Sequence, residues 1–176
     1  MQENHCLRPV AEEDIEALHS LLSVEAVFFY LADGVKPERS IAAGWVDESL
    51  SDFERFDVGI WCLSGQTDGQ ISGLARLSDY DHGTMQLTYL LHPDMWGKGL
   101  ATRMAHTALS MAFRGDHVCE VWAGADKPNA ASISVMQRLG MAFQKDVQYP
   151  AGEGVEYRIT RADFDPRRME RLPICT

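Results

Sequence analysis

Two glycines with cations beside them are the strongest candidates for chemistry in this sequence. Gly97 and Gly99 stand directly before an apolar segment with helical spacing, and Lys98 and Arg103 supply positive charge nearby. Backbone amides at the start of a helix bind phosphate or pyrophosphate well when no side chain shields them. The pattern therefore predicts a phosphate-binding loop, with a simple tight turn as the alternative.

Two other phosphate-binding motifs fit this segment poorly. A Walker-type loop requires Gly-x-x-x-x-Gly-Lys-Ser/Thr, and the residues around Gly97 do not match it. A dinucleotide fingerprint requires a third small residue where this chain has Thr102, and an acidic residue about twenty positions further on. Glu120 lies near that distance, but the β-branched Thr102 and the extra turn residues argue against the fingerprint.

The elements on either side of the glycines can be predicted from a change of period. Apolar residues alternate with polar ones from Met85 to Leu91, as in a half-buried strand, and Pro93 ends that strand because it cannot donate to a ladder. From Leu100 onward, apolar residues recur every four positions, which is typical of a helix with one apolar face. The glycines therefore lie at a strand-to-helix turn.

This segment resembles the acetyl-CoA-binding motif of the GNAT family of N-acetyltransferases. The run Trp-Gly-Lys-Gly-Leu-Ala at residues 96–101 matches the family signature Gln/Arg-x-x-Gly-x-Gly/Ala except at its first position. Tryptophan there is common in the branch that acetylates ribosomal-protein N-termini (RimJ/RimL-like). A second motif, residues 129–141, is similar to that branch's Asn-x-x-Ser-x-x-Val-Leu-x-x-Leu-Gly-Phe. The order of elements fits the family over residues 7–164.

The resemblance implies a fold, a co-substrate and a set of contacts. The fold would be α/β: one acetyltransferase domain over residues 1–176, with a mixed, mostly antiparallel twisted sheet of about seven strands flanked by about four helices. The core would cover residues 7–164, and residues 165–176 would form a peripheral tail. The strand ending at Leu91 would splay from its neighbour and offer main-chain groups to the pantetheine arm, and the 96–102 loop would hold the pyrophosphate. The implied acetyl-CoA contacts are Leu90, Leu91, Trp96, Gly97, Lys98, Gly99, Leu100, Ala101, Thr102 and Asn129.

The acid–base residues of the family are less well matched. Where members often carry a catalytic Glu, this chain has Gln86, which cannot accept a proton at neutral pH. Where many carry a general-acid Tyr, it has Met136. Ser132 is then the candidate proton donor to the departing thiolate, and capping of the helix that follows Asn129 is the alternative role. Asn129 suits both a cap and a cofactor contact.

The general base remains unassigned. Glu120, more simply a surface carboxylate, and the loop residues Asp79, Asp81 and His82 are weak candidates, and turn chemistry alone explains the aspartates. His92 suits packing beside Pro93. The histidines show no metal-site spacing, and no nucleophilic triad can be argued, so we expect no metal.

Composition limits the partners and the compartment. With 176 residues, 45% hydrophobic and 24% charged, the chain suits one globular domain. The net charge of −10 excludes nucleic acid as a favoured partner. Residues 1–60 hold 4 Lys/Arg and 13 Asp/Glu. In the resembling family the N-terminal helices wall the acceptor site, so this negative charge would attract a cationic amine. A solvated surface is the alternative. The scattered cysteines favour a reducing compartment, and the sequence has no apolar run of transmembrane length. We therefore expect a cytoplasmic protein. A homodimer is left open.

The remaining patterns predict the framework. A helix should carry Ile15 to Leu22, the aromatic segment 27–31 should be core filler rather than an acceptor-pocket wall, and Pro37 should open a helix in which Ile41 and Trp45 pack together. Strands are expected over residues 7–10, 58–62, 71–77, 117–123 and 155–159, with Asp68-Gly69 as a hairpin turn. Gly140 should end the helix that begins near Asn129.

Two functions follow as alternatives. The first is direct transfer of an acetyl group from acetyl-CoA to a primary amine, either a protein N-terminus or a small amine. The second is a catalytically degenerate module of the same fold that binds acyl-CoA as a sensor, which Gln86 and Met136 keep open.

Overall fold

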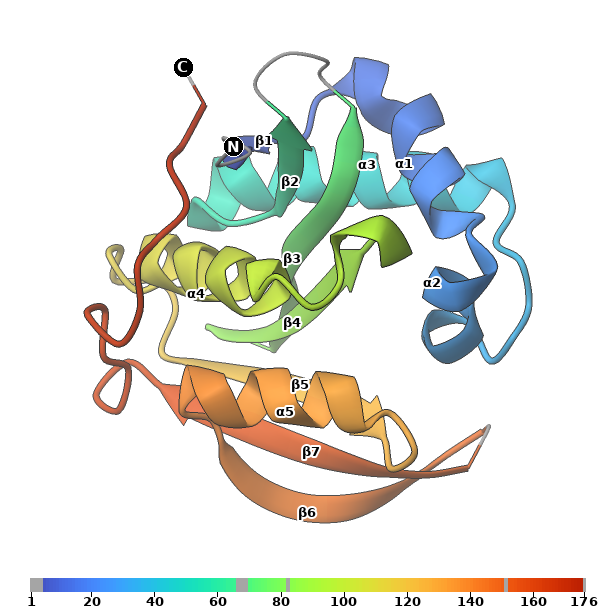
Figure 1. The fold of residues 1–176 in the computed structure, drawn as a ribbon. Helices are drawn as coiled ribbons and strands as arrows, with labels where there is room; N and C mark the ends of the chain where they lie inside the picture. The colour runs from blue at the N-terminus through green and yellow to red at the C-terminus, as the bar shows by residue number, and fades with distance from the viewer. Residues whose placement is uncertain (1–4, 66–69, 82, 151, 176) are drawn as a thin grey trace.

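A seven-stranded sheet organises the chain in a computed structural model that describes residues 5–65, 70–81, 83–150 and 152–175 (Figure 1). The spatial strand order is β1-β2-β3-β4-β5-β7-β6. The strands are β1 (His5–Pro9), β2 (Ile60–Gly65), β3 (Ile71–Asp81), β4 (Thr84–Leu91), β5 (Glu120–Asp126), β6 (Ala142–Tyr149) and β7 (Gly152–Thr160). The helices are η1 (Glu12–Asp14), α1 (Ile15–Leu22), α2 (Glu25–Leu31), α3 (Arg39–Phe56), η2 (Pro93–Met95), α4 (Leu100–Ala112) and α5 (Ala130–Leu139). Within the described ranges, no helix is both long enough and apolar enough to cross a membrane.

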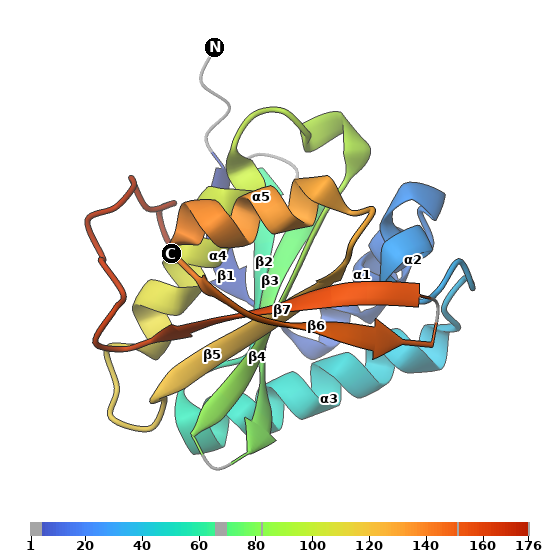
Figure 2. The same cartoon turned by 90° about the horizontal axis from the view of Figure 1, so that it is seen from below.

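One pair of strands breaks the antiparallel pattern of the sheet. Strands β4 and β5 run parallel, and they pair only from Thr84 to Gln86 on β4 and from Glu120 to Trp122 on β5. Beyond these residues the two strands part, as the view in Figure 2 shows. The splay that the family resemblance implied is therefore confirmed, and it leaves an opening in the middle of the sheet.

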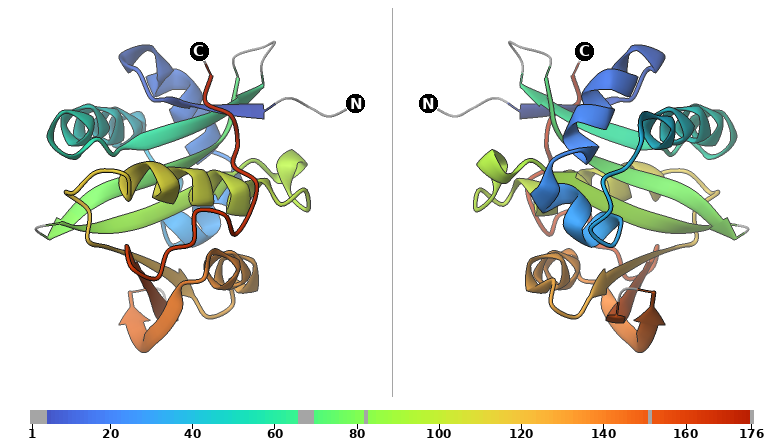
Figure 3. Two further views of the ribbon diagram at one scale, coloured as in Figure 1. Left: turned by 90° about the vertical axis from the view of Figure 1, so that its left-hand side faces the viewer. Right: turned by 90° about the vertical axis from the view of Figure 1, so that its right-hand side faces the viewer.

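The helices cover the two faces of the sheet, with α4 and α5 on one side and α1 to α3 on the other (Figure 3). Alternation along β4 divides its side chains between the two sides. Met85, Leu87 and Leu91 join the core cluster that includes α4 and α5, whereas Leu90 packs against the cluster built on α1 and α3. Each face of β4 at the opening thus meets a different set of helices.

The main elements predicted around the glycines are confirmed. The 85–91 alternation lies on β4, the four-residue period begins α4 at Leu100, and Gly140 ends α5 in the left-handed conformation at φ 84°. Seven strands are confirmed, with five α-helices where about four were expected. The predicted Asp68-Gly69 turn lies outside the described residues, although β2 and β3 pair antiparallel on either side of it.

Two predictions of core packing are wrong. The aromatic segment forms α2, in which Val27 is buried but Phe29 and Tyr30 are 56% and 41% exposed, because the short helix turns only one face to the core. On α3, Ile41 is 46% exposed, while Ala42, Val46 and Ser49 are buried. The buried face is one residue further round the helix than the apolar spacing indicated.

The C-terminal segment is integrated into the fold, which corrects the expectation of a peripheral tail. The amide of Leu172 donates to Thr107 Oγ1 of α4 over 3.0 Å, and Leu172 is buried. Further on, Leu7 of β1 exchanges 2.8 Å main-chain hydrogen bonds with Pro173 and Cys175.

A disulfide between Cys6 and Cys175 closes this junction, so the preference for reduced cysteines over disulfides is wrong for these two. They lie 169 residues apart in the sequence. Only the return of the tail to β1 brings them together, which no local spacing could indicate.

Candidate active site

The loop between β4 and α4 is shaped by its two glycines. Gly97 and Gly99 adopt φ values of 76° and 72°, a region that disfavours residues with a Cβ. A Cβ added at either position would meet nothing within 4 Å, so packing within the described protein does not demand glycine there. Gly99 is also the N-cap of α4, which leaves the first amides of this 13-residue helix directed outward. The strand-to-helix turn with unshielded backbone amides, which the two glycines predicted, is thus present.

Trp96 fixes the start of this loop against the end of β4. Its indole Nε1 donates to the carbonyl of Leu91 over 2.8 Å, while 54% of the residue remains exposed. Lys98 lies on the outside of the loop, where its Nζ lies 3.7 Å from Met95 Sδ. Trp96, at the position where the family signature has Gln or Arg, therefore links the start of the loop to the end of β4 by a hydrogen bond.

A cavity of about 920 Å³ passes through the opening between β4 and β5. It is lined by residues from both faces of the sheet, including β4, the glycine loop, the start of α5, the end of β5 and α2. Of the predicted acetyl-CoA contacts, all but Lys98 line the cavity, namely Leu90, Leu91, Trp96, Gly97, Gly99, Leu100, Ala101, Thr102 and Asn129. The predicted catalytic residue Ser132 lines it too. The two sequence motifs, residues 96–101 and 129–141, are therefore brought to one cavity.

The start of α5 presents a hydrogen-bonded group to this cavity. Asn129 caps the helix through its side-chain oxygen, which accepts the amide of Ser132 over 3.1 Å. The Tyr89 hydroxyl on β4 lies 2.7 Å from Ser132 Oγ and donates to the Ser132 carbonyl over 2.8 Å. Burial raises the pKa of Tyr89 to about 12. Sequence reasoning missed Tyr89, although the alternation of β4 places it on the same face as Leu87 and Leu91.

The opposite end of the cavity contains an aromatic ring laid over two glycines. A Cβ at Gly124 would lie 2.2 Å from the Tyr149 hydroxyl, and one at Gly154 would lie 2.2 Å from the Tyr149 ring. Burial raises the pKa of Tyr149, and the carboxylates of Glu156 and Asp126 add to the shift. The Tyr149 ring forms one wall of the cavity. It fits there because Gly124 on β5 and Gly154 on β7 have no side chain.

Two carboxylates line the same end, and neither was among the predicted site residues. Asp126 ends β5 on the same face as Gly124, and Asp33 follows α2 in the left-handed conformation at φ 51°. Tyr30 of α2 joins this wall, so the predicted role of the aromatic segment as core filler alone is wrong. The alternation of β5 is the one sequence signal that could have indicated Asp126.

The weaker base candidates do not reach this cavity. Glu120 accepts the indole N–H of Trp122 over 2.8 Å and pairs with Arg158 at 3.0 Å. His92 caps η2, with its Nδ1 accepting the Asp94 amide over 3.4 Å. Each of these side chains has a structural partner outside the lining.

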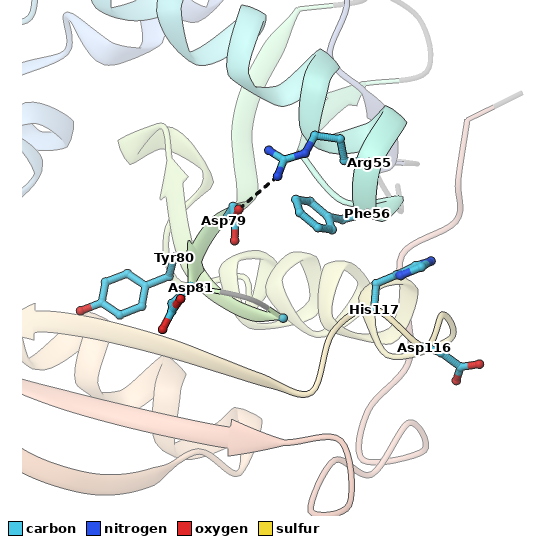
Figure 4. Close-up of a pocket in the computed structure, with 8 residues that line it drawn as sticks. Arg55, Phe56, Asp79, Tyr80, Asp81, Asp116 and His117 are labelled. Atoms are coloured by element: carbon cyan, nitrogen blue, oxygen red, sulfur yellow. Dashed lines mark ion pairs between the residues drawn. The ribbon is translucent and has the colours of Figure 1, made fainter.

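Asp79 and Asp81 lie at the far end of β3, in a second, smaller cavity shown in Figure 4. There Asp79 forms an ion pair with Arg55 at 3.7 Å. His82 lies outside the described residues. Asp79 and Asp81 therefore do not line the larger cavity between β4 and β5.

The positions that depart from the family pattern occupy different surroundings. Gln86 is exposed and lines the cavity at the point where β4 leaves β5, whereas Met136 is fully buried in the core. Among the described residues, no group of His, Cys, Asp or Glu side chains could hold a metal ion.

Comparisons with known proteins agree with this geometry. Residues 5–142 match the family model described as an acetyltransferase (GNAT) domain. The spermidine N(1)-acetyltransferase of Escherichia coli (strain K12) is 24% identical over 154 residues, covering 86% of this chain and 80% of that protein. Among solved structures, the ribosomal-protein α-N-acetyltransferase RimL in complex with coenzyme A superposes with a TM-score of 0.74 at 15% identity, over 88% of this chain and 92% of that one. The yncA protein of Salmonella typhimurium with acetyl-CoA gives 0.73 at 18% identity, over 90% and 94% of the two chains. The chain belongs to the GNAT family of acetyltransferases.

Proposed function

We propose that this protein transfers an acetyl group from acetyl-CoA directly to a cationic primary amine. The observation that carries the proposal is the cavity through the sheet, which is lined by the Gly97–Gly99 loop and by the carboxylates of Asp33 and Asp126. Two substrates entering from opposite faces would meet at the opening between β4 and β5. Such positioning supplies much of the rate enhancement in a transfer between two bound molecules.

The diphosphate of CoA is assigned to the amides that follow Gly97 and Gly99. The positive end of α4 favours an anion there, and Lys98 and Arg103 add mobile charge near the loop. Arg103 pairs with Glu170 of the C-terminal segment at 3.5 Å, an exposed contact that a phosphate can replace. Asn129 is assigned to the pantetheine arm where the arm passes the start of α5.

Main-chain groups of β4 are assigned to the amides of the pantetheine arm. Opposite residues in an antiparallel pair alternate between hydrogen-bonded and non-hydrogen-bonded pairs. The His92 amide donates to Ser72 over 2.8 Å, and by the register of β3 with β4 this makes Leu90 a hydrogen-bonded partner of Leu74. Tyr89 and Leu91 then direct their main-chain groups toward the opening. We therefore assign the pantetheine contacts to Tyr89 and Leu91 rather than to the Leu90 main chain.

The acceptor is assigned to the face that carries α2 and the β6–β7 hairpin. Asp33 and Asp126 supply negative charge there, and Tyr30 and Tyr149 supply aromatic faces that attract cations. Arg138 is the one basic side chain in the described lining, and it comes from α5 on the opposite face. A relative that acetylates spermidine supports an acceptor with more than one amine. We assign a small polyamine ahead of a protein N-terminus.

The reaction requires few groups. The amine loses a proton, its nitrogen forms the C–N bond, and the C–S bond breaks with its electron pair remaining on sulfur. Asp126 lies on the acceptor side and is assigned to holding the ammonium and receiving its proton through water. Ser132 lies on the CoA side, where its hydroxyl stabilises the leaving thiolate. No acyl-enzyme intermediate is needed.

Turnover with a panel of amines tests this proposal. Purified protein is mixed with acetyl-CoA and spermidine, a monoamine of similar length, or a short basic peptide, and free CoA thiol and acetylated product are measured together. The proposal predicts acetylated polyamine above the protein-free control, with a lower rate for the monoamine. CoA binding without any acetylated product would instead favour the degenerate module to which Gln86 and Met136 point.

A further inference from the structure

We propose that Tyr89 is a positioning residue, which aims the Ser132 hydroxyl at the departing thiolate of CoA. The inference rests on the proposed transfer from acetyl-CoA. It concerns the contact between Tyr89 of β4, which lies outside both sequence motifs, and Ser132 of α5.

The capping role of Ser132 is already filled by its neighbour. Asn129 Oδ1 accepts the amide of Ser132, so the serine hydroxyl is not required to cap α5. That hydroxyl instead lies 2.7 Å from the Tyr89 oxygen. Both side chains line the cavity at the opening of the sheet. The structure thus favours a functional role for the Ser132 hydroxyl over capping.

The hydroxyl of Tyr89 has a single proton and two acceptors within reach, the Ser132 carbonyl at 2.8 Å and Ser132 Oγ at 2.7 Å. When Tyr89 donates to the carbonyl, the serine proton is drawn to the Tyr89 oxygen. When Tyr89 donates to Oγ, the serine proton is released toward the cavity. Charge that develops on sulfur favours the second arrangement, because an ionised acceptor makes the stronger hydrogen bond.

Complete proton transfer from this pair is unfavourable. Burial raises the pKa of Tyr89 to about 12, so its hydroxyl keeps its proton and acts as a hydrogen-bond donor. Burial therefore opposes the formation of a tyrosinate at this contact. The proton that the ammonium loses leaves by the acceptor side, and CoA departs as a thiolate that solvent later protonates.

A double-mutant cycle on kcat tests the coupling. We expect Ser132→Ala to lower kcat about 100-fold and Tyr89→Phe to lower it about tenfold, with the KM for acetyl-CoA changed less than about threefold. In the Ser132→Ala background, Tyr89→Phe should have no further effect, because its target is already gone. The matched control is Tyr157→Phe, which removes a 3.3 Å hydrogen bond to Gln137 on the same helix and should leave kcat unchanged.

The outcomes separate this inference from the proposed function. If the two substitutions lower kcat independently, so that their losses multiply in the double variant, the inference is overturned. Such a result would mean that Tyr89 supports α5 through the Ser132 carbonyl, a contact that Ser132→Ala leaves in place. An equal loss in Tyr157→Phe would overturn it too, since that variant touches only the packing of α5. If Tyr89→Phe fails to fold, unchanged kcat in Ser132→Ala alone is sufficient to overturn it. No turnover by the wild-type protein would refute the proposed function, and this inference with it.

Discussion

Replacement of Gly99 by alanine separates the cost of backbone strain from the loss of a phosphate site. Gly99 sits at φ 72° with open space around its missing Cβ, so the added methyl group meets no protein atom within 4 Å. The left-handed conformation costs a residue with a Cβ about 1–2 kcal/mol of the free energy of unfolding. A ligand that approaches the amides closely meets the methyl group as well.

Gly34 provides a matched control in the same chain. It has φ 75° and likewise nothing within 4 Å of an added Cβ, but it does not line the cavity. We expect Gly34→Ala and Gly99→Ala to lose similar free energies of unfolding, about 1–2 kcal/mol each. Only Gly99→Ala should weaken CoA binding, by about 10- to 100-fold, because a hydrogen bond to a charged group contributes about 1.5–3 kcal/mol.

Urea denaturation and titration calorimetry with CoA measure the two effects separately. Equal CoA affinity in wild type, Gly34→Ala and Gly99→Ala would refute the assignment of the diphosphate to this loop. A Gly99→Ala protein that loses affinity only in proportion to its unfolded fraction would refute it equally.

Three further changes test other parts of the site. Asp126→Asn should lower kcat/KM for a polyamine about 10- to 100-fold and weaken its dependence on salt, and an unchanged value would exclude the carboxylate from the acceptor site. Gly124→Ala should displace the Tyr149 hydroxyl and so raise the KM for the acceptor. The loss in the free energy of unfolding should be no more than about 1 kcal/mol, because the end of the tyrosine side chain can move away. A KM for the acceptor equal to that of wild type would contradict this. Burial lowers the pKa of His106, whose Nε2 lies 3.1 Å from the Asp165 carbonyl. Its folded pKa is therefore below that of the unfolded chain, so wild type should lose stability as pH falls below about 6.5, by at most about 1.4 kcal/mol per pH unit. Urea midpoints at two pH values should show a smaller loss for His106→Leu, and equal losses would contradict the account.

The part of the site that sequence could predict is the part encoded locally. The change of period between Leu91 and Leu100, with glycines between, determines a strand, a turn and a helix within about twenty residues. Asn129 and Gly140 likewise define both ends of α5. These signals depend on backbone conformation and capping, which act between near neighbours.

The acceptor wall could not be predicted in the same way. Asp33, Asp126 and Tyr149 come from three segments that meet only after the sheet has formed. Tyr149 in particular is placed by glycines on two other strands, and those glycines look like ordinary flexible positions in the sequence. The disulfide between Cys6 and Cys175 has the same character, since it depends on where the tail returns.

A crystal structure with a CoA thioester bound tests the central claim most directly. The account predicts the diphosphate on the amides that follow Gly97 and Gly99, the pantetheine arm along Tyr89 and Leu91, and the sulfur within hydrogen-bonding distance of Ser132 Oγ. A diphosphate bound elsewhere, or a sulfur remote from the opening between β4 and β5, would contradict it.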